Sequence, residues 1–187
     1  SPSTQRALVA YRCGAEGAGP TAYLQAGLHA DEMPGILVLQ HLMPLLQAAE
    51  AAGQMMGEVL VVPMANPIGL SQWAFQRPLG RQDANSMHNF NRDYPDLAEL
   101  VAARIEPLLT QSETANRDVI RAAFRTALAE HRAAVLTEMV QMQAALLEWS
   151  CDADYVLDLH CDHHAVMHLY TSPARPADTS ALCRAVG

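Results

Sequence analysis

The stretch TAYLQAGLHADEMPG, residues 21–35, decides the fold. Its first part, Thr21–Leu28, is a short apolar run bounded by turn residues, as expected of a buried strand. From Met33 the pattern becomes helical, and Pro34 suits the first turn of a helix. Glu58–Pro63 follows as a second buried strand with the sequence EVLVVP. Strand, helix and strand in this order predict a parallel α/β sheet.

The pattern on either side of this unit predicts further elements. The helix from Met33 should stop at Gly53, and Pro44 inside it predicts a kink or break. Residues 64–95 have no clear period, and an aperiodic segment of this length in a compact domain is often functional. The other predicted elements are an edge strand or hairpin arm at Arg6–Tyr11, a helix capped by Asp96 and ended or bent by Pro107, a long helix or helix pair over Asn116–Trp149, strands at Asp154–His160 and Val166–Thr171, and a helix at Thr179–Val186.

Composition predicts one globular α/β domain over residues 1–187, with a helical segment at 96–150 inside it. Half of the residues are hydrophobic and 17% are charged, which argues against disorder. The net charge of −8 and the lack of a Lys/Arg run argue against nucleic acid and anionic membranes as partners. Four scattered cysteines predict reduced thiols in a cytoplasmic protein. Since the last predicted helix has no closing element after it, we expect an N-terminal part of a longer protein.

Two histidines each follow an apolar strand, at the edge of an open α/β sheet where ligands bind. His29 and Glu32 are three residues apart, so one turn brings their side chains to a common side. His160 would add a third ligand from a distant strand. Two histidines and one carboxylate leave a fourth position for water, which is the arrangement of catalytic zinc. The spacing H-x-x-E alone is weak, and the second histidine at a strand end strengthens it.

Neighbouring acidic groups have structural alternatives. Asp158 precedes His160 by two residues and faces the same way in a strand, so it could orient a ligand histidine or be satisfied by backbone donors. We expect Asp31 to cap the helix that begins at Met33. His41 and His131 are expected to be ordinary helix residues. The pattern leaves open the roles of the remaining histidines, which are His88, His163, His164 and His168.

The aperiodic segment carries Arg81, Asn91 and Arg92 in GRQDANSMHNFNRDYPD. Arginine binds carboxylates in bidentate fashion and stabilises oxyanions. On composition alone, salt bridges from these arginines to Asp83, Asp93 or Asp96 would be preferred.

The segments GLHADE, VPMANPIGL, HNFNRDYP and DLHCD…HLYTSP, in this order from about Thr21 to Pro173, resemble the succinylglutamate desuccinylase/aspartoacylase family of the zinc carboxypeptidase clan. The resemblance implies a three-layer α/β/α fold with a mixed, mostly parallel sheet, to which residues 97–150 add a long helical insertion. It implies that His29, Glu32 and His160 bind one zinc ion. It further implies that Asn91 and Arg92 grip a substrate carboxylate and that Arg81 polarises the scissile carbonyl.

The implied activity is zinc-dependent hydrolysis of the amide bond of an N-acyl amino acid or similar small carboxylate. The family's general base is a glutamate on a later strand, and no glutamate follows His160 here. We therefore expect the base to lie beyond Gly187 and this chain alone not to be fully competent. A metallocarboxypeptidase acting on peptides is one alternative, and a metal-stabilised binding module without catalysis is another. The methionine-bearing helices leave a homo-oligomer open.

Overall fold

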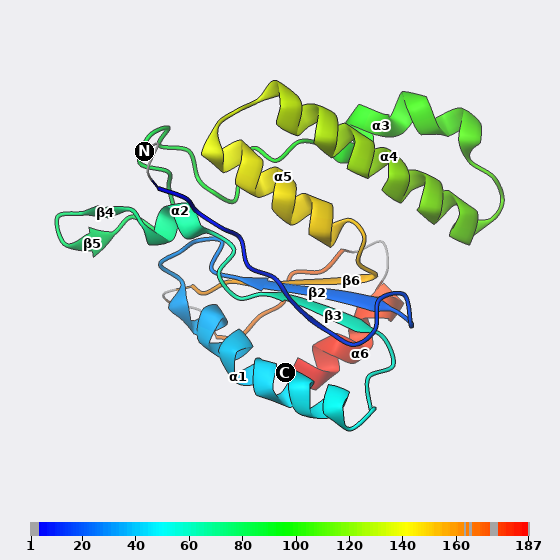
Figure 1. The fold of residues 1–187 in the computed structure, drawn as a ribbon, viewed down its shortest axis with the longest axis horizontal. Helices are drawn as coiled ribbons and strands as arrows, with labels where there is room; N and C mark the ends of the chain where they lie inside the picture. The colour runs from blue at the N-terminus through cyan, green and yellow to red at the C-terminus, as the bar shows by residue number, and fades with distance from the viewer. Residues whose placement is uncertain (1–3, 163, 165, 173–175, 187) are drawn as a thin grey trace.

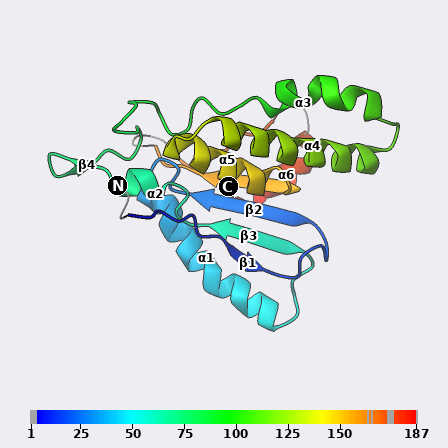
Figure 2. The ribbon, with the colours of Figure 1, turned by 45° about the horizontal axis from the view of Figure 1, so that its top comes forward.

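The computed structural model describes residues 4–162, 164, 166–172 and 176–186. Its main sheet lies between two helical layers, with α1 on one face and α3, α4 and α5 on the other (Figures 1 and 2). The elements are β1 Tyr11–Cys13, β2 Thr21–Ala26, α1 Met33–Ala51, β3 Glu58–Val62, α2 Pro67–Leu70, β4 Trp73–Ala74, β5 Arg77–Pro78, α3 Leu97–Ile105, a 3-10 turn Glu106–Leu108, α4 Glu113–Ala134, α5 Glu138–Ser150, β6 Tyr155–Leu159 and α6 Pro176–Val186. The three-layer α/β architecture with a mixed sheet is confirmed.

The four-stranded sheet has the order β1-β3-β2-β6. β2 pairs in parallel with β3 on one side and with β6 on the other, while β1 pairs antiparallel with the outer edge of β3. The chain thus leaves β2 through α1 to reach β3, and reaches β6 only after the helices on the opposite face. The space between the carboxyl ends of β2 and β6 is therefore the point where strand order reverses, which is where open α/β sheets bind ligands.

Alternating strand residues separate the core into two layers. Tyr23, Leu60 and Val62 lie in one buried cluster with Met142 and Leu146 of α5. Ala26 and Val61 lie in the other cluster, with Ile36 and Leu39 of α1. Because both faces of β2 and β3 are covered, these strands read as continuous apolar runs rather than as polar–apolar alternation.

Several expected elements differ in the structure. The N-terminal strand is at Tyr11–Cys13 instead of Arg6–Tyr11, since residues 11–13 are the ones that pair with β3. α1 continues unbroken through Pro44. Val166–Thr171 is irregular and exposed, so the predicted strand there is wrong. A β-prone run becomes a strand only with a partner, and within the described residues none pairs with this one.

The helical expectations are largely confirmed. Asp96 caps α3 by accepting a hydrogen bond from the Glu99 N–H, and the α-helix gives way to a 3-10 turn that contains Pro107. The helix pair is α4 and α5, and Thr137 caps the second member.

The four cysteines are free thiols. Among the described helices, none combines the length and the apolar character that crossing a membrane requires.

Asp154 fixes the register at the amino ends of β2 and β6. Its Oδ2 accepts the Thr21 N–H at 2.9 Å, and its own N–H donates to the Thr21 carbonyl at 2.8 Å. Arg121 donates to the other carboxylate oxygen at 3.0 Å. The Thr21 N–H, together with Arg121 and against a smaller effect of burial, holds the pKa of Asp154 below its usual value.

This depressed pKa predicts a pH-dependent contribution to stability. The contribution is present above the unfolded-state pKa of about 3.9 and is lost as the pH falls through the folded-state value. Asp154→Asn should therefore lower the free energy of unfolding by about 1 kcal/mol at pH 7, and the difference should shrink as the pH falls below about 4. Urea unfolding between pH 3 and pH 7 measures it. The control is Asp152→Asn, which removes a more exposed ion pair with Arg125 and should cost less. Equal losses in the two variants would contradict the assignment.

Candidate metal centre

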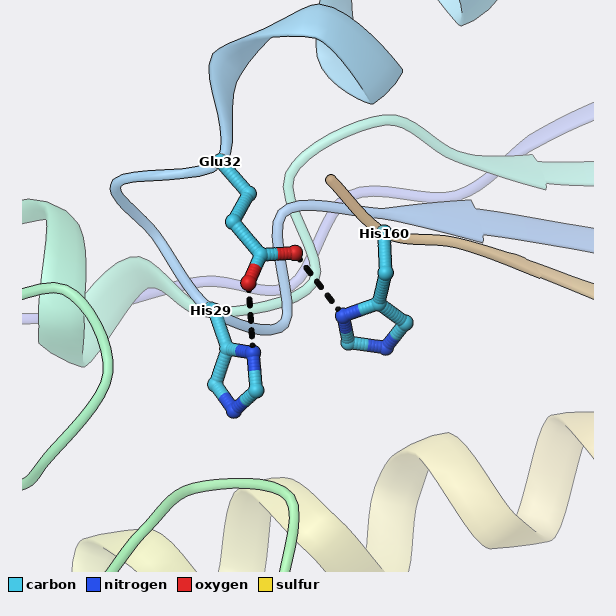
Figure 3. A group of neighbouring side chains, drawn as sticks. All are labelled: His29, Glu32 and His160. Carbon is cyan, nitrogen blue, oxygen red and sulfur yellow. Dashed lines mark hydrogen bonds and ion pairs between the residues drawn. The ribbon is translucent and has the colours of Figure 1, made fainter. Parts of the chain in front are cut away.

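The carboxyl ends of β2 and β6 bring three ligand-type side chains together. His29 lies in the turn after β2, Glu32 lies at the start of α1, and His160 directly follows β6. Figure 3 shows the Glu32 carboxylate between the two imidazole rings. One potential ligand atom from each residue lies within 4.8 Å of the other two. The ring centroids of His29 and His160 are 5.1 Å apart.

The buried carboxylate of Glu32 is the shared acceptor of this cluster. Its Oε1 lies 2.9 Å from His29 Nδ1 and accepts a hydrogen bond from Arg81 Nη2 at 2.7 Å. Its Oε2 lies 3.0 Å from His160 Nδ1 and accepts the Cys161 N–H at 2.8 Å. Burial on its own would raise the pKa of Glu32, but the Cys161 N–H and the two histidines outweigh burial and hold the pKa below its usual value. The ionised form of Glu32 is therefore favoured, and its carboxylate can bind a cation.

The second ring nitrogen of His29 is held by Asn89. Asn89 Oδ1 accepts the Asn91 N–H at 2.8 Å, which identifies that atom as the amide oxygen. His29 Nε2 lies 2.9 Å from the same oxygen, so it must carry a hydrogen and donate it. A neutral His29 then has its lone pair on Nδ1, facing Glu32.

His160 is held in the same way by Asp158. Its Nε2 lies 2.9 Å from Asp158 Oδ2, and its Nδ1 faces Glu32. Asn91 Nδ2 approaches the same Nε2 at 3.5 Å. The Asp158 carboxylate raises the pKa of His160 above its usual value, against burial, and Glu32 adds to the effect. Asp158 therefore contacts the histidine that its position two residues earlier in the strand predicts.

The donor chemistry of the cluster fits a metal cation. Each imidazole has an acceptor at Nε2 and a carboxylate oxygen at Nδ1, so both nitrogens face electron-rich atoms. Such a ring is satisfied only as an imidazolium or with a cation at its lone pair. Two adjacent imidazoliums repel each other, whereas one cation bound by both Nδ1 atoms and by Glu32 satisfies all three ligands. An outer acceptor that fixes the tautomer is also the usual support of a metal-bound histidine.

The sequence analysis missed Asn89, although a signal was present. Asn89 and Asn91 flank the apolar Phe90 in the sequence. In the structure residues 89–92 form a turn, in which the Arg92 N–H donates to the Asn89 carbonyl at 3.1 Å. Phe90 is fully buried in the core cluster that also contains residues of α5. The two flanking asparagines reach His29 and His160 respectively.

The two arginines lie differently with respect to the cluster. Arg81 pairs with Glu32 and not with the nearby aspartates of its own segment. Arg92 is exposed, and its Nη1 donates to the Asn91 carbonyl at 2.7 Å.

The structure corrects the prediction for Asp31 and bears on three of the histidines whose roles the sequence left open. Asp31 does not cap α1, because the residue at the N-cap position is Glu32 and no side chain caps that end. His88 pairs with Asp93 on the exposed loop. His29, Glu32 and His160 are called the metal-type cluster below. Among the described residues, neither His164 nor His168 belongs to this cluster, and His163 lies outside those residues.

The family model for the succinylglutamate desuccinylase/aspartoacylase catalytic domain matches residues 18–186 of the sequence. The chain belongs to this family. A solved family protein from Shewanella amazonensis is 32% identical, with a TM-score of 0.62, and the match covers 83% of this chain and 42% of that one. A second desuccinylase/aspartoacylase structure, from Shewanella frigidimarina, is 29% identical with a TM-score of 0.65, over 82% of this chain and 41% of that one. This chain thus spans about two fifths of the length of these relatives. No curated protein matches it.

Removal of the amide that orients His29 should weaken metal binding in this family member. Asn89→Ala leaves Nε2 without its acceptor, so the correct tautomer is no longer enforced, and the affinity for Zn²⁺ should fall about 10- to 100-fold. Competition with a chelator in the full-length protein measures this. Asn85→Ala is the control, since Asn85 lies in the same loop and its side chain donates to Asp83 at 3.4 Å rather than to a histidine. An unchanged affinity in Asn89→Ala would show that the amide does not support the metal site.

Proposed function

We propose that the full-length protein is a zinc-dependent hydrolase that cleaves the amide bond of an N-acyl amino acid or a similar small carboxylate. The observation that carries this proposal is the convergence of His29 Nδ1, His160 Nδ1 and the Glu32 carboxylate, with both outer nitrogens held by acceptors. Membership of a family named for a desuccinylase and an aspartoacylase supports the reaction class.

Two imidazoles and one carboxylate are a ligand set typical of catalytic zinc. A zinc ion held by these residues would act as a Lewis acid on the substrate carbonyl and would make water nucleophilic near neutral pH. Glu32 supplies the negative charge of the set, and Asn89 and Asp158 keep the imidazoles in the binding tautomer. We assign the stabilisation of the oxyanion and the binding of the substrate carboxylate to Arg81, Asn91 and Arg92, which lie between α2 and α3.

Arg81 is proposed to stabilise the oxyanion that develops when the amide is attacked. Its guanidinium already reaches the cluster, at 2.7 Å from Glu32 Oε1, and its side chain is half exposed. A fixed cation at this position would gain interaction energy as negative charge forms on the carbonyl oxygen, an effect typically worth about 3 kcal/mol.

Asn91 and Arg92 are proposed to hold the substrate carboxylate. Asn91 lies beside His160, and Arg92 is its exposed neighbour in the chain. A guanidinium and an amide offer planar donors that match the two oxygens of a carboxylate. This grip would place the substrate with its amide toward the histidine pair.

A comparison of two substrate classes tests the proposal. The full-length protein loaded with Zn²⁺ should hydrolyse N-acyl amino acids with a higher kcat/KM than peptides with a free C-terminal carboxylate. Faster peptide cleavage would instead make it a metallocarboxypeptidase, because the same carboxylate grip suits a peptide terminus. Zinc binding without hydrolysis of either class would leave a metal-stabilised binding module.

Arg92→Ala should weaken substrate binding far more than zinc binding. Loss of the guanidinium removes a contact made in both the ground and the transition state, so KM should rise at least tenfold with a smaller change in kcat. The zinc content should remain equal to that of the wild type. Arg104→Ala is the matched control, since Arg104 pairs with Glu130 on the helical layer and should affect neither quantity. Unchanged Michaelis behaviour of Arg92→Ala would exclude the carboxylate role.

A further inference from the structure

We propose that Gln143 of α5 is a positioning residue. It holds the backbone of the loop that carries Asn91 and Arg92, and through this contact the helical segment 96–150 keeps the loop in place. The loop is defined as residues 89–92, with the sequence NFNR, and is called the NFNR loop below. The inference rests on the proposed function in one respect, because it assigns Asn91 and Arg92 to the substrate.

Gln143 joins the NFNR loop at two backbone points. Its Nε2 donates to the Phe90 carbonyl at 3.0 Å and to the Arg92 carbonyl at 2.8 Å. The Phe90 carbonyl belongs to the peptide group before Asn91, and the Arg92 carbonyl belongs to the peptide group after Arg92. Gln143 therefore holds the chain on both sides of the Asn91–Arg92 pair. The side chain of Gln143 is buried, with the residue 2% exposed, so water does not readily replace the contacts.

An apolar anchor lies beside this polar one. Phe90 is fully buried in the same core cluster as Met142 and Leu146, which neighbour Gln143 on α5. The helix therefore fixes the loop by its ring and by its backbone. The asparagines on either side of the ring are then directed to His29 and His160.

A buried glutamine at this position has no evident use for the helix itself. Both hydrogen bonds that its amide nitrogen donates leave α5 and cross to residues about 50 positions earlier in the chain. Burial of an amide costs free energy unless its hydrogen bonds are made, and an apolar residue would pack α5 without that cost. A carboxylate of the same shape would face two carbonyl oxygens with no hydrogen to donate. The geometry thus specifies a neutral double donor.

Gln143 donates to backbone carbonyls of the NFNR loop and not to the side chains proposed to bind the substrate. It acts through the backbone that carries Asn89, Asn91 and Arg92. The helices α3 to α5, which pack on the face opposite α1, thereby acquire a role as the support of the substrate loop (Figure 1).

The chain supplies a matched control two residues away. Gln141 also lies on α5, and its Nε2 also donates to two backbone carbonyls, those of Arg132 at 2.7 Å and Val135 at 2.6 Å. Both carbonyls belong to the end of α4 and the turn between the helices. Substitution of Gln141 therefore removes the same chemistry without touching the NFNR loop.

The test compares Gln143→Met with Gln141→Met in the full-length protein. Hydrogen exchange of the amides of residues 89–92 should become at least tenfold faster in Gln143→Met and stay unchanged in Gln141→Met. With an N-acyl amino acid as substrate, KM should rise about tenfold in Gln143→Met with a smaller change in kcat, and neither should change in the control. Both variants should lower the melting temperature.

The two readouts separate this inference from the proposed function. If the wild-type protein hydrolyses no N-acyl amino acid, the proposed function fails, and hydrogen exchange alone decides the role of Gln143. Equal exchange rates of the loop amides in the two variants, or an unchanged KM in Gln143→Met of an active enzyme, would overturn the inference. Should Gln143→Met not fold, Gln143→Asn, whose amide is shorter by one methylene and so cannot reach both carbonyls, provides the same comparison.

Discussion

The parallel pairing of β2 with β6 is the constraint on which the rest of the structure depends. It joins segments more than 130 residues apart and sets Ala26 opposite Leu159, so the turn with His29 and the residue His160 leave the sheet at one edge. Asp154 locks the same register at the other end of the strands. A slip of one residue would turn alternate side chains to the wrong face and separate the histidines.

The chemistry at that edge is organised by a buried anion. Glu32 accepts hydrogen bonds from the Arg81 side chain and the Cys161 backbone and faces both imidazoles, so four groups from three parts of the chain converge on one carboxylate. A buried carboxylate is tolerated only when such partners offset its lost hydration. Because the imidazoles are also held by outer acceptors, the cluster is complementary to a cation.

Local sequence patterns predicted the parts of this site that lie close together in the chain. His29 and Glu32 were recognisable by their spacing after a strand, and Asp158 by its position two residues before His160. The same local reasoning was wrong about Asp31, because the N-cap position of α1 is occupied by Glu32. It was also wrong about the strand at Val166–Thr171, because a strand needs a partner strand. It missed Asn89 and gave no role to Gln143, because both act on groups far from them in the sequence.

The sequence by itself determined the strand–helix–strand unit, the residue types of the metal-type cluster and the family, because apolar periodicity and short motifs are local properties. The tertiary structure alone decided which nitrogen of each histidine faces Glu32, that Arg81 pairs with Glu32 rather than with a neighbouring aspartate, and that α5 holds the NFNR loop. These facts depend on contacts between segments that only the packed sheet and its two helical layers bring within hydrogen-bond distance. No periodicity along the chain encodes such distances.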